Sequence, residues 1–154
     1  MTDDQKLVVE RVIDQPAGVL FEILSNPERH KELDETGTVV SDHKSDRIQE
    51  VGQVFTMNMH ADAMGGDYQT DNHVTGYEEN KRLAWQTVPA GTEPAGWQWM
   101  WELEPQGSDS TLVRLTYDWS KVTDKKVLER VKFPLFPESM LEQSLSRLAT
   151  AAGS

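Results

Sequence analysis

The sequence contains no cysteine, and this absence removes several kinds of chemistry at once. Without thiols, the 154-residue chain has no disulfide bonds, no thiolate metal ligands and no cysteine nucleophile. No apolar run approaches the ~20 residues that a membrane-spanning helix needs. The segment Met1 to Lys6 lacks the basic and apolar stretches of a signal peptide. We therefore expect a cytoplasmic protein without stable membrane insertion.

Positive charge is also scarce. Fifteen basic residues stand against 26 acidic ones, which gives a net charge of −11 at neutral pH. A field of this sign repels phosphate backbones, so nucleic acid is not an expected partner.

Common catalytic motifs are missing as well. The four histidines, His30, His43, His60 and His73, form no metal-ligand pattern, and there is no phosphate-binding loop, dinucleotide fingerprint or nucleophile elbow. We expect neither a metal nor a cofactor and assign no catalytic residue. Cofactor-free chemistry remains open.

What the chain does contain is a succession of short alternating segments. The pattern predicts a strand over 6–14 and two short helices within 17–34. Further strands are expected over 38–48, 53–61, 67–79, 82–88, 97–104 and 111–119, with helical segments over 124–133 and 138–152. Strands that follow one another without helices pair antiparallel, so the prediction is a single α+β domain spanning residues 1–154.

The strand 97–104 has the clearest pattern. Trp97, Trp99 and Trp101 alternate onto one side, and each indole can bury up to ~250 Å². This row must face a helix, a partner or a cavity, and the apolar stripe of the last helix is its nearest cover. Methionines would add adaptable lining to a cavity; they are Met57, Met59, Met64, Met100 and Met140. A solid core is the alternative.

Several short motifs, taken together, resemble one superfamily. They are Pro16–Phe21, Asn26–His30, Leu33–Gly37, Asn72–Thr75, Arg82–Trp85 and Trp101–Pro105. Their order is similar to the START-like (Bet v 1-like, SRPBCC) superfamily, in its polyketide cyclase/dehydrase and lipid-transport branch. The resemblance implies a helix-grip fold, in which about seven antiparallel strands curve around a C-terminal helix, and a hydrophobic ligand cavity. It implies no particular reaction. Pro134 and Pro137 depart from the pattern and should separate 124–133 from the last helix.

The strand 53–61 can face the cavity in two ways. Apolar residues favour turning Phe55, Met57 and Met59 inward. The other assignment turns His60 inward as a general base oriented by Asp62. On the first assignment the expected ligand-binding residues are Phe55, Met57, Met59, Tyr68, Thr70, Asn72, Trp85, Trp97, Trp99, Trp101, Tyr117, Met140, Leu141 and Ser144. Thr87 would join the polar part of this lining, unless these polar groups satisfy one another.

We expect a binding protein for a small hydrophobic or aromatic molecule. The alternative is a cofactor-free enzyme of the cyclase or dehydratase kind, and a third reading is a module that docks a partner on its sheet. A homodimer is left open. His30 should serve packing near the cavity entrance. Lys121, Lys125, Lys126, Arg130 and Lys132 should form a solvated helix face or, less simply, a site for an acidic partner.

Overall fold

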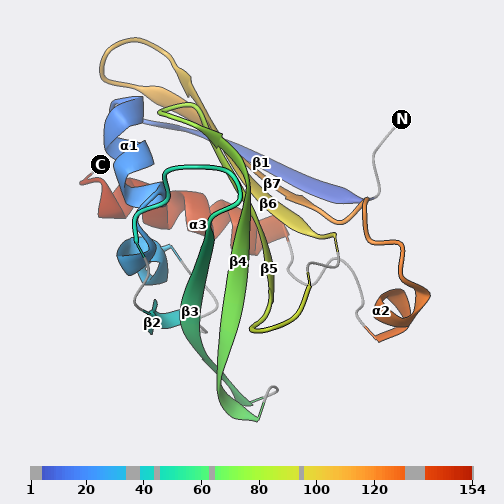
Figure 1. Cartoon of the computed structure of the whole chain (residues 1–154). Helices are drawn as coiled ribbons and strands as arrows, with labels where there is room; N and C mark the ends of the chain where they lie inside the picture. Colours follow the sequence, from blue (N-terminus) through green and yellow to red (C-terminus); the bar gives the residue numbers. More distant parts are fainter. Residues whose placement is uncertain are drawn as a thin grey trace.

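Seven strands form one antiparallel sheet in the computed structural model, in the order β1-β7-β6-β5-β4-β3-β2 (Figure 1). The structure describes residues 5–33, 39–43, 46–62, 65–93, 96–130 and 138–153. The strands are β1 (Lys6–Ile13), β2 (Val39–Asp42), β3 (Val54–Ala61), β4 (Gly66–Glu78), β5 (Arg82–Pro89), β6 (Gln98–Pro105) and β7 (Thr111–Asp118). The helices are α1 (Ala17–Leu24), the 3-10 helix η1 (Pro27–Glu32), α2 (Lys125–Arg130) and α3 (Glu138–Ala151).

Local residue chemistry sets where these elements begin and end. Pro16 precedes α1, and Asn26 begins η1 by accepting a hydrogen bond from the Glu28 N–H at 3.1 Å. Asn80 lies in the turn from β4 to β5 with φ of 62°, a left-handed conformation that asparagine tolerates well. Each strand from β3 to β6 pairs antiparallel with the next one along the chain.

The long helix α3 covers one face of the sheet near its β1 edge. Its apolar stripe, Leu141, Leu145 and Leu148, is fully buried. The helix packs against β1 and β7 and also meets α1 and η1. This arrangement confirms the predicted α+β helix-grip fold, with two short helices after the first strand.

Two expected elements differ from the structure, and a third is only partly described. The strand expected over 38–48 ends at Asp42, because Ile48 turns into the core and its N–H bonds to the Ser25 carbonyl at 2.8 Å. The second short helix is a 3-10 helix. The helical segment expected over 124–133 is described only as α2, and the break expected at Pro134 and Pro137 lies outside the described residues.

The loop before β6 lies against the chain that follows β7. Gly96 has φ of +123°, and a Cβ at this position would lie 2.6 Å from the Lys121 carbonyl oxygen. Only glycine fits such an approach without movement of the backbone. Trp97, next in the sequence, immediately precedes β6. Within the described residues, no helix combines the length and the apolar character needed to cross a bilayer.

Candidate functional site

Cross-strand pairing gathers the expected ligand-binding side chains on one face of the sheet, here called the inner face. Trp99 pairs with Trp85 on β5 and with Tyr117 on β7, so all three side chains project the same way. On the neighbouring strands the pairs are Phe55 with Asn72, Met57 with Thr70, and Met59 with Tyr68. Phe55 and Met57 are buried, which confirms that their side of β3 faces inward.

The centre of the inner face is aromatic. The rings of Trp99 and Tyr117 stack with centroids 4.4 Å apart and an interplanar angle of 27°. Trp119 lies beyond, with its ring centroid 5.5 Å from that of Tyr117. Burial raises the pKa of the Tyr117 phenol above its usual value, so this ring stays neutral. Together these rings form an uncharged aromatic surface.

The polar groups beside this surface bond to one another. The Asn72 amide donates to the Phe55 carbonyl at 3.2 Å, and its oxygen accepts from the Thr87 hydroxyl at 2.6 Å. The amide nitrogen and the amide oxygen of Asn72 therefore both bond within the sheet. This agrees with the alternative in which the polar groups satisfy one another. Satisfied groups of this kind fix the positions of the neighbouring side chains.

His30 joins η1 to the inner face. Its Nε2 lies 2.7 Å from the Leu24 carbonyl oxygen and must donate, because a carbonyl only accepts. The imidazole stacks on Trp85, with centroids 5.1 Å apart, and meets Phe55 edge-on at 5.3 Å. Burial lowers the pKa of His30 to about 4, so the ring is neutral near pH 7. The expected packing role is confirmed, and it lies in the core.

Cover over the inner face is uneven. Toward α1 the side chains are buried; they include Leu83, Trp101 and Leu115. Toward the opposite end Thr70, Tyr117 and Trp119 are still buried, but other inner-face side chains are only half-buried; they are Met59, Tyr68, Thr87, Trp97 and Trp99. Met140 and Ser144 of α3 are half-buried too. We call these seven residues the partly covered end; it is where a bound molecule could touch the face.

Some expected lining residues lie elsewhere. Met100 pairs with Ala84 and Thr116 on the outer face, because its neighbours Trp99 and Trp101 face inward. Met64 lies outside the described residues. The inward assignment of His60 is wrong: its side chain is exposed, with Nδ1 2.7 Å from Asp67 and Nε2 3.7 Å from Asp62. For the residues expected to bind ligand, contact with a ligand stays a prediction.

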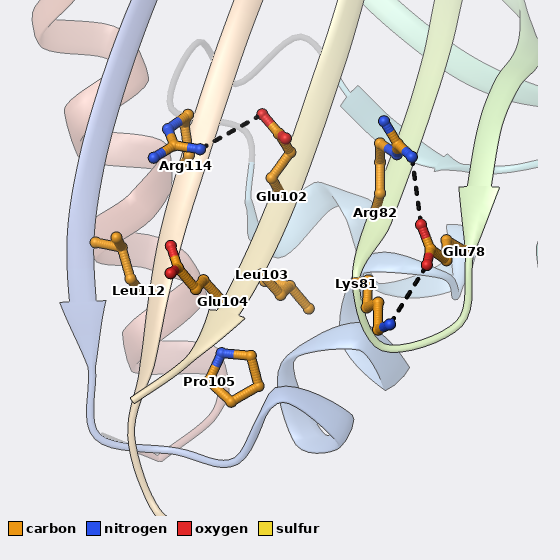
Figure 2. A pocket seen from close by; sticks show the side chains of 9 residues that line it. All are labelled: Glu78, Lys81, Arg82, Glu102, Leu103, Glu104, Pro105, Leu112 and Arg114. Atoms are coloured by element: carbon orange, nitrogen blue, oxygen red, sulfur yellow. Dashed lines mark hydrogen bonds and ion pairs between the residues drawn. The ribbon is translucent and has the colours of Figure 1, made fainter. Parts of the chain in front are cut away.

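The outer face carries a hollow of about 330 Å³ that is unlike the expected apolar space (Figure 2). Its lining is Glu78, Lys81, Arg82, Glu102, Leu103, Glu104, Pro105, Leu112 and Arg114. The charged groups pair across it, with Glu78 reaching both Lys81 at 3.5 Å and Arg82 at 3.3 Å. Six of the nine lining residues are charged, so the hollow differs from the apolar space expected for the ligand.

In the described part of the chain, no group of three or more histidine, aspartate or glutamate side chains is arranged to hold a metal ion. Lys121, Lys125 and Lys126 are exposed on and before α2, as expected of a solvated helix face. Lys132 lies outside the described residues, and the side chain of Arg130 is not described, so the complete basic cluster stays a prediction.

Comparison with family models gives one match over most of the chain. Residues 14–153 match the model described as Activator of Hsp90 ATPase homolog 1-like protein. Among curated proteins, Uncharacterized protein Rv0088 of Mycobacterium tuberculosis is 34% identical over 104 residues, or 68% of this chain and 43% of that protein. The chain thus spans less than half the length of the curated relatives it matches.

Solved structures agree in fold at low sequence identity. The crystal structure of protein CV1439 from Chromobacterium violaceum superposes with a TM-score of 0.67 at 14% identity, covering 99% of each chain. The solution structure of the AHSA1-like protein from Aeromonas hydrophila gives a TM-score of 0.62 at 16% identity, covering 96% of this chain and 94% of that one. At such identity the likeness establishes the fold alone.

Proposed function

The chain belongs to the Activator of Hsp90 ATPase homolog 1-like family, and from this premise we propose that it binds a small, uncharged apolar or aromatic molecule between the inner face of its sheet and α3. The observation that carries the proposal is the uneven cover of the inner face. Large apolar side chains such as Trp99 and Met59 stay half-buried on the concave side of a sheet whose other end is enclosed. Water contact with such side chains is unfavourable, and an apolar occupant would remove it.

The chemistry of the partly covered end supports a neutral, apolar or aromatic occupant. Trp99, stacked on Tyr117, offers a planar surface suited to an aromatic ring. Met59 offers a flexible, polarizable side chain that adapts to different shapes. No residue of the partly covered end carries a charge at neutral pH. A charged group placed there would lose its hydration without a counter-charge, so the molecule should be neutral at the part it buries.

A cofactor-free cyclase or dehydratase is the alternative function. The superfamily that the sequence motifs resemble includes such enzymes. Acid–base catalysis needs a group that changes protonation near the working pH. Burial raises the pKa of Tyr117 and lowers that of His30 to about 4, which keeps both groups neutral. The Nε2–H of His30 is also engaged by Leu24. Binding requires no reactive group, so it is the function we favour.

The family description refers to activation of the Hsp90 ATPase, which is a property of the namesake. A docking surface for a large partner would need a contiguous exposed apolar patch. The large hydrophobic side chains exposed among the described residues are single valines spread over several elements; they are Val8, Val12, Val19, Val40, Val51 and Val54. We therefore do not extend that activity to this chain.

Replacing Trp99 with alanine is expected to weaken binding of N-phenylnaphthylamine, a neutral fluorescent probe of apolar sites, by about tenfold or more. The substitution removes the ring that would stack on the probe, and stacking with its buried area is worth at least ~1.4 kcal/mol, a factor of ten. The measurement is titration of the probe, followed by its own fluorescence, with competition by a panel of neutral lipids and aromatic compounds.

Met100→Ala is the matched control, since Met100 is the next residue in β6, also half-buried, and faces the other side of the sheet. Its dissociation constant for the probe should equal that of the unmodified protein. Thermal unfolding of both variants tests whether they remain folded. Equal affinity of all three proteins, or no saturable binding to the unmodified one, would contradict the proposal.

A further inference from the structure

The strand β1 forms one edge of the sheet, and within the described residues no bulge interrupts it and no further strand pairs with it. At the opposite edge, β2 has four residues and an irregular register with β3, features that discourage pairing with another chain. β1 pairs with β7 over eight consecutive residues without a bulge. Its sequence, KLVVERVI, contains no proline. A long, regular edge of this kind can receive another strand.

The backbone phase of β1 leaves alternate residues turned toward that edge. The Trp119 N–H donates to the Gln5 carbonyl at 2.9 Å, which places Gln5 in a hydrogen-bonded position opposite β7. By alternation, Leu7 and Val9 also bond toward β7. The N–H and C=O groups of Val8 and Glu10 therefore point away from the sheet. In the described part of the chain, these N–H and C=O groups have no backbone hydrogen-bond partner outside the sheet.

A row of alternating charges crosses the outer face and ends at the same edge. Register places Glu78, Arg82, Glu102, Arg114 and Glu10 side by side on five neighbouring strands. Arg114 lies 2.7 Å from Glu10. Arg114 also lies 3.9 Å from Glu102, and Arg82 lies 3.3 Å from Glu78 (Figure 2). The row ends at the β1 edge with the carboxylate of Glu10. A basic side chain placed beyond Glu10 would therefore continue the alternation of charges.

We propose that β1 pairs antiparallel with β1 of a second copy of this chain, with Val8 on the two-fold axis. In this register Val8 faces Val8 of the partner subunit on the outer face. Lys6 lies opposite Glu10 of the partner subunit, which continues the charge row into the second sheet. Val8 is 41% exposed in the single chain, and its self-contact removes apolar surface from water. The interface is isologous, as expected of a symmetric dimer.

Other symmetric registers of β1 fit less well. An axis at Glu10 would place two carboxylates opposite each other, which is unfavourable in a strand pair. An axis at Val9 would put Val8 opposite Glu10, and an axis at Leu7 would put Val8 opposite Lys6. Only the axis at Val8 joins apolar to apolar and acidic to basic residues on the outer face.

The absence of native cysteine allows a direct test of this register. Residues of a hydrogen-bonded antiparallel pair have Cα atoms about 5.5 Å apart, a separation that a disulfide can span. We expect Val8→Cys to form a covalent dimer under mild oxidation. Val12→Cys is the matched control, on the same strand and face and more exposed, at 54%. In the proposed register the two copies of position 12 are about 26 Å apart and should not cross-link.

Proline at the axis tests the role of the backbone. The Val8 N–H does not bond to β7, so Val8→Pro should leave the single chain folded while removing two hydrogen bonds between the copies. Val8→Thr keeps the N–H and the branched shape. Sedimentation equilibrium should show a dimer for the unmodified chain and for Val8→Thr, and a monomer for Val8→Pro. Circular dichroism tests folding.

Three results would overturn the proposal. They are a monomeric unmodified chain at all accessible concentrations, a dimeric Val8→Pro variant, and cross-linking of Val12→Cys as fast as that of Val8→Cys. Probe binding by the monomeric variant would show that the inner face acts independently of dimer formation.

Discussion

Replacing Leu145 with alanine is expected to lower the free energy of unfolding by roughly 2 to 5 kcal/mol. Leu145 lies in the middle of the apolar stripe of α3 and is 1% exposed. Its truncation removes buried methyl groups and leaves a cavity between α3 and the sheet, and both effects destabilise the folded chain. Because α3 forms one side of the proposed ligand space, the same change should also weaken probe binding. Chemical denaturation followed by circular dichroism measures the loss of stability.

Glu142→Ala is the control for this helix. Glu142 is exposed on α3, and alanine is a good helix former, so the stability should change by no more than about 0.5 kcal/mol. If Leu145→Ala cost less than about 1 kcal/mol, α3 would not be docked on the sheet as described, and the space between them would lose one side.

Acidification is expected to destabilise the protein through His30 by about 3 kcal/mol in total. The imidazole has a pKa of about 4 in the folded chain and a usual value of 6.5. Below pH 6.5 the unfolded chain therefore binds a proton at His30 that the folded chain does not bind. Stability falls as the pH drops from about 6.5 to about 4, by ~1.4 kcal/mol per unit of pKa difference. Protonation of His30 would also place a positive charge in the core, beside Trp85, Phe55 and the Leu24 carbonyl.

The measurement is the free energy of unfolding as a function of pH for the unmodified chain and for His30→Phe. The variant has no imidazole at this site, so its stability should depend less on pH in this window, even if the unpaired Leu24 carbonyl lowers its stability throughout. His43→Phe, at an exposed position, is the matched control and should keep the steeper dependence. Parallel curves for the unmodified chain and His30→Phe would show that His30 does not carry the effect.

The sequence patterns predicted the fold well where alternation was strong. Trp99 and Trp101 identified the inner side of β6, and Leu141, Leu145 and Leu148 identified the buried stripe of α3. The expected Bet v 1-like (SRPBCC) superfamily is confirmed through the matched family, whereas its polyketide cyclase and lipid-transport branch is not confirmed. The strand expected over 38–48 was too long. Ile48 is buried and its N–H bonds to the Ser25 carbonyl, a long-range contact that alternation along the sequence does not predict.

The position of His30 was harder to foresee. A helical period of 3.6 residues gives η1 no apolar stripe, but a 3-10 helix has three residues per turn. With that period Pro27, His30 and Leu33 share one side, and all three are buried. This three-residue spacing is the sequence pattern that could have identified the buried side of η1. The charge row on the outer face depends on the register of five strands, which the turn residues did not determine.

The most direct test of the proposed function is the position of N-phenylnaphthylamine on the protein. It can be mapped by changes in the nuclear magnetic resonance signals of the backbone amides and of the indole N–H groups of the five tryptophans during titration. Binding at the inner face predicts that the largest changes occur at Trp99, Met59, Tyr68 and Ser144. Changes confined to Glu102, Arg114 and their neighbours around the outer hollow would contradict it.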